Sequence, residues 1–232
     1  MRLLYRNYQK GQKPSDLLSW SHHVELLRID DPLERSSVIY LEGGGESKEL
    51  HSRCREGFRK LLEKNGFKGN MPRLVACGSR NSVFSDFRIA HQSKMHPFVA
   101  LWIDSEDPVA DIEKTWEHLE KRDGWEKPEK SSNEQVLFMT TSMETLIATD
   151  RNALKECFKN NLQKSALPPL NNLESKSRKE LFDILKHATR SCPSQYEKGK
   201  KSFELLGLLD AKTLRQHLPS VERTWRILEK NL

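Results

Sequence analysis

The first regular pattern along the chain joins a short apolar run to a helical stripe. The run V-I-Y-L at residues 38–41 ends abruptly in Glu42 and three glycines, as expected for a buried strand followed by a tight turn. Apolar residues then recur at helical spacing, at Leu50, Cys54, Phe58, Leu61 and Leu62. This spacing predicts an amphipathic helix that ends near Asn65 and Gly66.

Three more apolar runs follow, each succeeded by a helical pattern. They are R-L-V-A-C-G at 73–78, F-V-A-L-W-I at 98–103 and Q-V-L-F-M-T-T at 135–141. We predict one helix from about Asn81, another that starts at Asp107-Pro108, and a third after Ser142. Strands that alternate with helices indicate an α/β fold with a mainly parallel central sheet, whose ligands gather at the carboxyl ends of the strands.

The two ends of the chain differ from this middle part. Residues 1–36 show only two short candidate strands, at 3–5 and 24–29, and the adjacent His22 and His23 would point opposite ways on a strand, so they are not expected to share a metal ion. Helical patterns dominate from Leu154 onward. We therefore divide the chain into an N-terminal extension (1–36), an α/β domain (37–150) and a C-terminal helical subdomain (151–232).

The sequence of the glycine turn matches neither of two common phosphate-binding motifs. Gly43–Lys48 runs G-G-G-E-S-K, which fits neither the Walker loop nor the dinucleotide pattern G-x-G-x-x-G. Glu42 and Glu46 would also repel a polyphosphate, so this turn suits a divalent metal better than bare phosphate. The alternative is a solvated turn in which Glu46 stands in the first turn of the following helix.

Further acids stand where the later strands end. Asp104, Glu106 and Asp107 follow the third strand, and Glu144 follows the fourth. In a parallel sheet they would converge with Glu42 at one edge, where their repulsion calls for a cation such as Mg²⁺ or Mn²⁺. Two helix-capping alternatives stay open: Asp107 can cap the helix after it, and Glu144 can stand in a first turn capped by Ser142.

Basic residues concentrate in the last third of the chain. The net charge is +6, but residues 1–150 carry 22 Lys and Arg against 24 Asp and Glu, whereas residues 151–232 carry 17 against 9. A basic helical surface favours DNA or RNA, with binding that weakens as salt rises, although a solvated lysine-rich face gives the same composition. We expect nucleic-acid contacts from Arg80 and from the densest basic loop, Lys198, Lys200 and Lys201.

Cysteine usage and hydropathy exclude several protein classes. The four cysteines show no C-x-x-C spacing, which argues against a zinc site and against a secreted, disulfide-stapled fold. The sequence contains no apolar run of 18 residues, and its N-terminus lacks the apolar segment of a signal peptide. We therefore expect a cytoplasmic protein without a membrane anchor.

The acid pattern resembles the TOPRIM fold, and especially the TOPRIM-like nucleases of the OLD type (overcoming lysogenization defect) and their stand-alone relatives in bacterial phage-defence operons. That family has a glutamate after its first strand, often a second acid four residues on, an acidic pair after its third strand, a later S-x-E-like element and a lysine near the end. The matching residues here are Glu42 with Glu46, Asp104 with Glu106, Ser142 with Glu144, and Lys198 or Lys200. The likeness covers residues 37–150 best, and its acidic pair is D-x-E rather than D-x-D.

The resemblance implies a metal-dependent nuclease that hydrolyses phosphodiester bonds as the effector of a phage-defence system. Two Mg²⁺ or Mn²⁺ ions about 3.5–4 Å apart would activate water and stabilise the leaving oxygen. Their expected ligands are Glu42, Glu46, Asp104, Glu106 and Glu144. Lys198 or Lys200 would neutralise the charge of the transition state, so the expected catalytic residues are these lysines with Glu42, Asp104 and Glu106.

The resemblance also bears on partners. OLD proteins carry an ABC-type ATPase, and this sequence has no Walker loop, so a separate subunit would supply that activity; a homo-oligomer is equally compatible. Two alternatives remain: a non-catalytic TOPRIM-like regulatory or adaptor subunit that docks on an ATPase or nucleic acid, and a nucleotidyl-transfer or primase-like role. The sequence does not distinguish DNA from tRNA or other RNA as the substrate.

Overall fold

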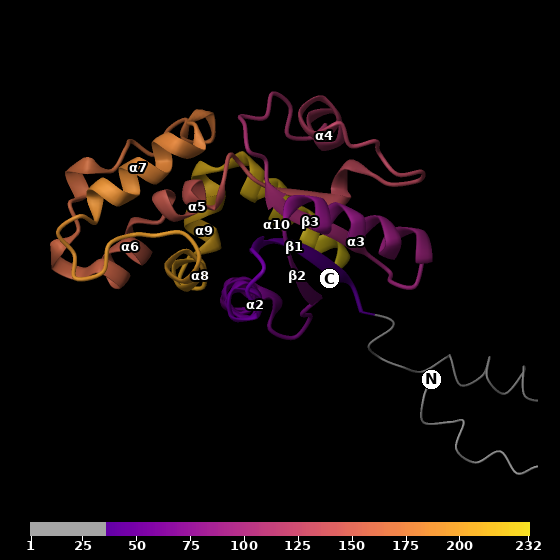
Figure 1. The fold of residues 1–232 in the computed structure, drawn as a ribbon, viewed down its shortest axis with the longest axis horizontal. Helices are drawn as coiled ribbons and strands as arrows, with labels where there is room; N and C mark the ends of the chain where they lie inside the picture. The colour runs from indigo at the N-terminus through magenta and orange to yellow at the C-terminus, as the bar shows by residue number, and fades with distance from the viewer. Residues whose placement is uncertain (1–35) are drawn as a thin grey trace, which may run out of the picture. The chain divides into compact units, whose positions relative to one another are not determined.

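Four parallel strands carry the fold in this computed structural model, which describes residues 36–232. The strands are β1 (Val38–Gly44), β2 (Arg73–Gly78), β3 (Val99–Asp104) and β4 (Val136–Met139), in the sheet order β2-β1-β3-β4 (Figure 1). The predicted α/β fold with a parallel central sheet is confirmed. The expected strands and the histidine pair of the N-terminal extension lie outside the described residues.

The strand order reverses direction at β1. Helix α2 (Lys48–Leu62) leads from β1 to β2 at one edge, and α3 (Arg80–Ser93) leads from β2 back across to β3 on the other side of β1. These two helices pack on opposite faces of the sheet, because their buried residues belong to different apolar cores. The gap between the carboxyl ends of β1 and β3 is therefore a topological switch point, where open α/β sheets bind their ligands.

Further helices cover both faces of the sheet. They are α4 (Thr115–Asp123), α5 (Met143–Thr149), α6 (Arg151–Phe158), α7 (Arg178–Ala188), α8 (Lys200–Leu206), α9 (Ala211–His217) and α10 (Pro219–Asn231), with a π-helical turn at Glu63–Phe67 and short 3-10 turns at Asn133–Gln135, Lys159–Asn161, Lys164–Ala166 and Leu173–Ser175. Helices α5 to α8 lie together at the left of the sheet in Figure 1. No helix among residues 36–232 is both long and apolar enough to span a membrane.

Alternate residues of each strand face two separate cores. On one face, Ile39 and Trp102 belong to a core that also contains residues of α2 and of every helix from α5 to α10. On the other face, Val38 and Leu101 pack with α3 and α4. The helices after residue 150 thus share a core with the glycine-turn helix, and residues 36–232 form one compact unit.

The helix predicted from Asp107-Pro108 begins later, at Thr115, so its predicted start is wrong. The carboxylate of Asp107 accepts a hydrogen bond from Arg122 Nε at 3.0 Å and caps no helix. The N-cap residue of α4 is Lys114, and the Oδ1 of Asn133 accepts the backbone N–H of Trp116 at 3.0 Å. A residue of the 3-10 turn before β4 therefore satisfies a backbone donor in the first turn of α4.

Candidate functional site

A hollow of about 380 Å³ opens at the switch point between β1 and β3. Leu41 pairs with Trp102 across these strands, so Glu42 and Asp104 follow at the same edge. Both acids line the hollow, together with the glycine turn, Glu144, Arg178 and Lys198. Side chains from β1, β3, α5, α7 and the loop before α8 thus meet where the fold predicts a ligand.

The glycine turn brings two backbones closer together than other residues would permit. Gly44 and Gly78, at the ends of β1 and β2, have φ values of +92° and +78°, in the region that favours glycine. A Cβ at Gly78 would lie 2.1 Å from the carbonyl oxygen of Gly45. The turn therefore folds over the end of β2 and leaves the neighbouring edge between β1 and β3 open.

Asp104 is the most strongly perturbed acid of the hollow. Its Oδ1 accepts the backbone N–H of Met143 at 2.9 Å, and Oδ2 lies 3.7 Å from Nη2 of Arg178. Burial, followed by repulsion from Glu42 and Glu144, raises the pKa of Asp104 to about 8, although Arg178 opposes the shift. The present cations therefore leave its negative charge incompletely compensated.

Glu42 is held in place by Arg80. Nη1 of Arg80 donates to Oε2 of Glu42 at 3.0 Å and to the backbone oxygen of Asp104 at 2.7 Å, while Nη2 pairs with Asp123 at 2.8 Å. Burial raises the pKa of Glu42 despite this arginine. Arg80, expected to contact nucleic acid, is only 15% exposed and binds the acids of the protein itself.

Glu144 is buried, with its side chain only 4% exposed. The hydroxyl of Tyr196 donates to its Oε1 at 3.0 Å, and Nζ of Lys198 lies 3.7 Å from the same oxygen. Glu144 stands in the first turn of α5, whose N-cap Ser142 makes no side-chain cap hydrogen bond. Glu144 therefore points into the protein, where a hydroxyl and an ammonium group hold it at the wall of the hollow.

The other candidate acids lie differently. Glu106 has a φ of +71° and pairs with Arg178 and, at 3.4 Å, with Arg122, so cations already occupy its carboxylate. Glu46 is exposed on the turn before α2 and does not line the hollow.

The candidate lysines also separate. Lys198 lines the hollow, whereas Lys200 is exposed at the start of α8. Lys201 pairs with Glu204 at 2.8 Å. The structure thus brings only one of these three lysines to the acids of the switch point.

Sequence reasoning missed Arg178 and Tyr196. Arg178 is the first residue of α7, directly after its N-cap Ser177, and Tyr196 lies in the loop before α8. Neither residue belongs to a recognisable motif. The only sequence signal was their position within the basic last third of the chain.

The fit of this site to a divalent metal depends on its arginines. Within residues 36–232, no group of three His, Cys, Asp or Glu side chains is arranged so that it could hold a metal ion. Arginine side chains contact the carboxylates of Glu42, Asp104 and Glu106 in this arrangement. The donor set suits a hard cation, because the acids are carboxylates and the ionised forms of Glu42 and Asp104 are disfavoured as they stand.

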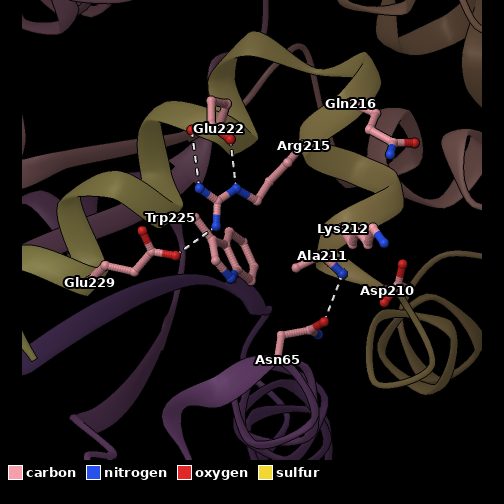
Figure 2. A pocket seen from close by; sticks show the side chains of 9 residues that line it. All are labelled: Asn65, Asp210, Ala211, Lys212, Arg215, Gln216, Glu222, Trp225 and Glu229. Carbon is pink, nitrogen blue, oxygen red and sulfur yellow. Dashed lines mark hydrogen bonds and ion pairs between the residues drawn. The ribbon is translucent and has the colours of Figure 1, made fainter.

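A second hollow, of about 440 Å³, lies between α9 and α10. Figure 2 shows Arg215 there between two acids: Nε bonds Glu222 and Nη1 bonds Glu229, both at 2.6 Å. The charges of this hollow thus largely neutralise one another. The switch-point hollow is the better functional candidate, because it combines two acids with raised pKa values and a position that the fold determines.

Comparisons with known proteins place the chain in a family. No curated protein and no solved structure matches it. Residues 41–229 match the family described as Domain of unknown function (DUF4276), a range that includes every residue named at the switch-point hollow. The chain therefore belongs to the DUF4276 family.

Proposed function

We propose that this protein is a divalent-metal-dependent nuclease that hydrolyses phosphodiester bonds in DNA or RNA at the switch-point hollow. The observation that carries the proposal is the pair Glu42 and Asp104, two carboxylates at adjacent strand ends whose side chains are 17% and 16% exposed and whose pKa values are both raised. A bound cation would stabilise their ionised forms. The resemblance of the acid pattern to TOPRIM-like nucleases supports the same chemistry.

We assign different roles in metal binding and catalysis to the residues of the hollow. Glu42 and Asp104 are the primary metal ligands, and Glu144 is a third carboxylate that lines the same hollow. Mg²⁺ or Mn²⁺, when bound, would activate a water molecule and stabilise the leaving oxygen. Lys198 is placed to neutralise the extra negative charge of the transition state. Because Glu46 does not line the hollow, we assign it no ligand role.

Metal binding requires a rearrangement of charge that the geometry permits. Arg80 uses Oε2 of Glu42, and Arg178 approaches only Oδ2 of Asp104, at 3.7 Å. A cation held by Glu42 and Asp104 would compete with the long Arg178 contact, while the bidentate pair of Arg80 with Asp123 keeps that arginine in place. Arg178 would keep its existing pair with Glu106, and it lines the hollow in which a substrate phosphate would bind.

The test is a cleavage assay with labelled single-stranded and duplex DNA and RNA in Mg²⁺ or Mn²⁺. Wild-type protein should cut at least one of these substrates, and EDTA should stop the reaction. Glu42→Gln and Asp104→Asn should each abolish cutting while circular dichroism shows an intact fold. Lys121→Ala, which removes an exposed charge on α4, is the matched control and should cut normally. Cutting by both acid variants at the wild-type rate would remove the catalytic proposal.

A second candidate function has its own support. The ion pairs that engage Glu42, Asp104 and Glu106 are what a non-catalytic regulatory or adaptor subunit would keep. Thermal-shift titration with Mn²⁺ separates the two candidates, because a ligand that binds the folded state raises its stability. Stabilisation by Mn²⁺ that Glu42→Ala abolishes favours the nuclease, and indifference to Mn²⁺ favours the adaptor.

The biological setting is proposed from the resemblance alone. The stand-alone TOPRIM-like relatives work beside a separate ATPase in phage defence, and we propose the same setting for this chain. Affinity purification from native cells should recover a protein with Walker motifs at a stoichiometric level. Recovery of the chain without an ATPase partner would count against this part of the proposal.

A further inference from the structure

One face of α7 runs outward from the switch-point hollow. Arg178, Phe182 and Lys186 stand four residues apart, so they share a face of the helix, with a rise of about 6 Å from each to the next. Arg178 lines the hollow and pairs with Glu106. We call the surface of these three residues and Lys198 the α7 track.

Phe182 is the centre of the α7 track. Its ring is half-buried, and the ammonium groups of Lys186 and Lys198 each lie 5.6 Å from the ring centroid. The ring packs edge-to-face with that of Tyr196, with the ring centroids 6.0 Å apart and the planes at 64°. Tyr196 also donates a hydrogen bond to Glu144, which lines the hollow. The ring of Phe182 is therefore held beside the hollow by its packing on Tyr196.

The excess of positive charge around the α7 track is complementary to a polyanion. Residues 176–201 carry eight Lys and Arg against three Asp and Glu. Of the acids, Glu180 is paired with Lys176 at 2.5 Å, while Asp183 and Glu197 are exposed. Alternation of cations with an aromatic ring is the arrangement by which proteins bind unpaired nucleotides, with phosphates on the cations and a base on the ring.

We propose that the α7 track binds a single strand of nucleic acid, with one unpaired base stacked on Phe182 and the adjoining phosphates on Lys186, Lys198 and Arg178. This inference deepens the proposed function, on which its link to cleavage rests, by naming an unpaired strand as the substrate class. The base displaces a lysine ammonium group from the ring. That exchange is favourable, because base stacking on an aromatic ring is stronger than an exposed cation–π contact.

The geometry disfavours intact duplex at this position. In a duplex the base faces are stacked on each other, so none is available to a half-buried ring. The phosphate contacts alone would bind duplex and single strand without regard to Phe182. Dependence on the aromatic ring is therefore the property that distinguishes the track from a merely basic surface.

The test measures binding without cleavage, by fluorescence anisotropy of labelled oligothymidylate, oligouridylate and a mixed-sequence duplex in EDTA. Phe182→Ala and Phe182→Leu should weaken binding of at least one single strand about tenfold and leave duplex binding unchanged. Phe182→Trp keeps an aromatic ring at this position and should bind the single strand as tightly as the wild type. Phe182→Leu keeps the apolar packing, so its effect reports stacking even where the alanine variant folds poorly.

Phe84→Ala is the matched control. Phe84 is also a half-buried phenylalanine on a helix surface, on α3, with a guanidinium group from Arg88 at 5.5 Å. It belongs to the other core and should leave single-strand binding unchanged. Wild-type affinity of both Phe182 variants for both single strands, or an equal loss with Phe84→Ala, would overturn the inference. If single strands bind in a way that depends on Phe182 but are not cut in Mg²⁺ or Mn²⁺, the proposed nuclease activity is refuted and the proposed strand binding by the α7 track is kept.

Discussion

Replacement of Asp104 by Asn should stabilise the protein while abolishing its proposed activity. The side chain keeps its shape, and the asparagine Oδ1 can still accept the backbone N–H of Met143. The substitution removes the negative charge that burial and the neighbouring acids disfavour. A gain in stability on loss of a charge is expected where a site is built for a ligand and not for the empty protein.

The size of the effect follows from the pKa of Asp104. A rise from 3.8 to about 8, at about 1.4 kcal/mol for each pKa unit, sets an upper limit of about 6 kcal/mol on the cost of ionising this carboxyl in the folded protein. The side chain is 16% exposed and loses its Arg178 contact on substitution, so the gain is smaller. We expect Asp104→Asn to raise the free energy of unfolding by about 2–3 kcal/mol at pH 8.

The gain should depend on pH. Between pH 3.8 and about 8 the folded protein retains a proton on Asp104 that the unfolded chain has released. The native state therefore binds more protons than the unfolded state, and wild-type stability falls as pH rises through this interval. The asparagine variant lacks this titration, so the stability difference should be small near pH 4 and largest near pH 8.

Urea denaturation in EDTA at several pH values measures this difference directly. A gain of about 2–3 kcal/mol corresponds to a rise of roughly 4–12 °C in Tm for a domain of this size. Mn²⁺ should reduce the difference in the free energy of unfolding between Asp104→Asn and wild type, because it would stabilise only the wild type. A variant that is less stable than wild type at pH 8, or a gap that does not change with pH, would refute the reasoning about the charge of Asp104.

Three further substitutions test the supporting contacts, and a fourth serves as a control for the last of them. Arg80→Ala leaves Glu42 without its arginine partner and Asp123 with Arg122 alone, and should lower the free energy of unfolding by about 3 kcal/mol in urea titrations. Tyr196→Phe removes the hydroxyl that bonds Glu144 and should cost about 1.5–3 kcal/mol, measured by thermal unfolding at neutral pH. Gly78→Ala should prevent folding or cost more than about 3 kcal/mol, whereas Gly124→Ala, with a similar φ of +68° but open space around it, should cost about 1 kcal/mol in the same assay.

Local sequence patterns predicted the sheet and one edge of the hollow. Apolar runs that end in an acid marked β1 and β3, and parallel strands place such acids at the same edge. Glu42 and Asp104 therefore line the hollow as the spacing of strands and helices suggested. The helix after the glycine turn was also predictable, because its stripe repeats over four turns with Ser47 as its cap.

Contacts between distant segments lay beyond the sequence patterns. Asn133 accepts a backbone N–H in the first turn of α4, and Arg80 forms its bidentate pair with Asp123, 43 residues away. Arg178 and Tyr196 reach the acids only through the packing of the C-terminal helices. No local period or motif records which distant side chain meets which carboxylate, so these partners became visible only in three dimensions.

The shared core between the sheet and the helices after residue 150 has a consequence for dissecting the protein. A fragment that stops at Asp150 would retain all four strands, α2 and the acids of the hollow, but it would lose the residues of α6 to α10 that belong to the same core as Trp102 and so expose part of that core. Bare apolar faces of this kind promote self-association. Deletion mapping would then report insolubility rather than the location of an activity, so substitutions within the intact chain are the sounder way to separate metal binding from strand binding.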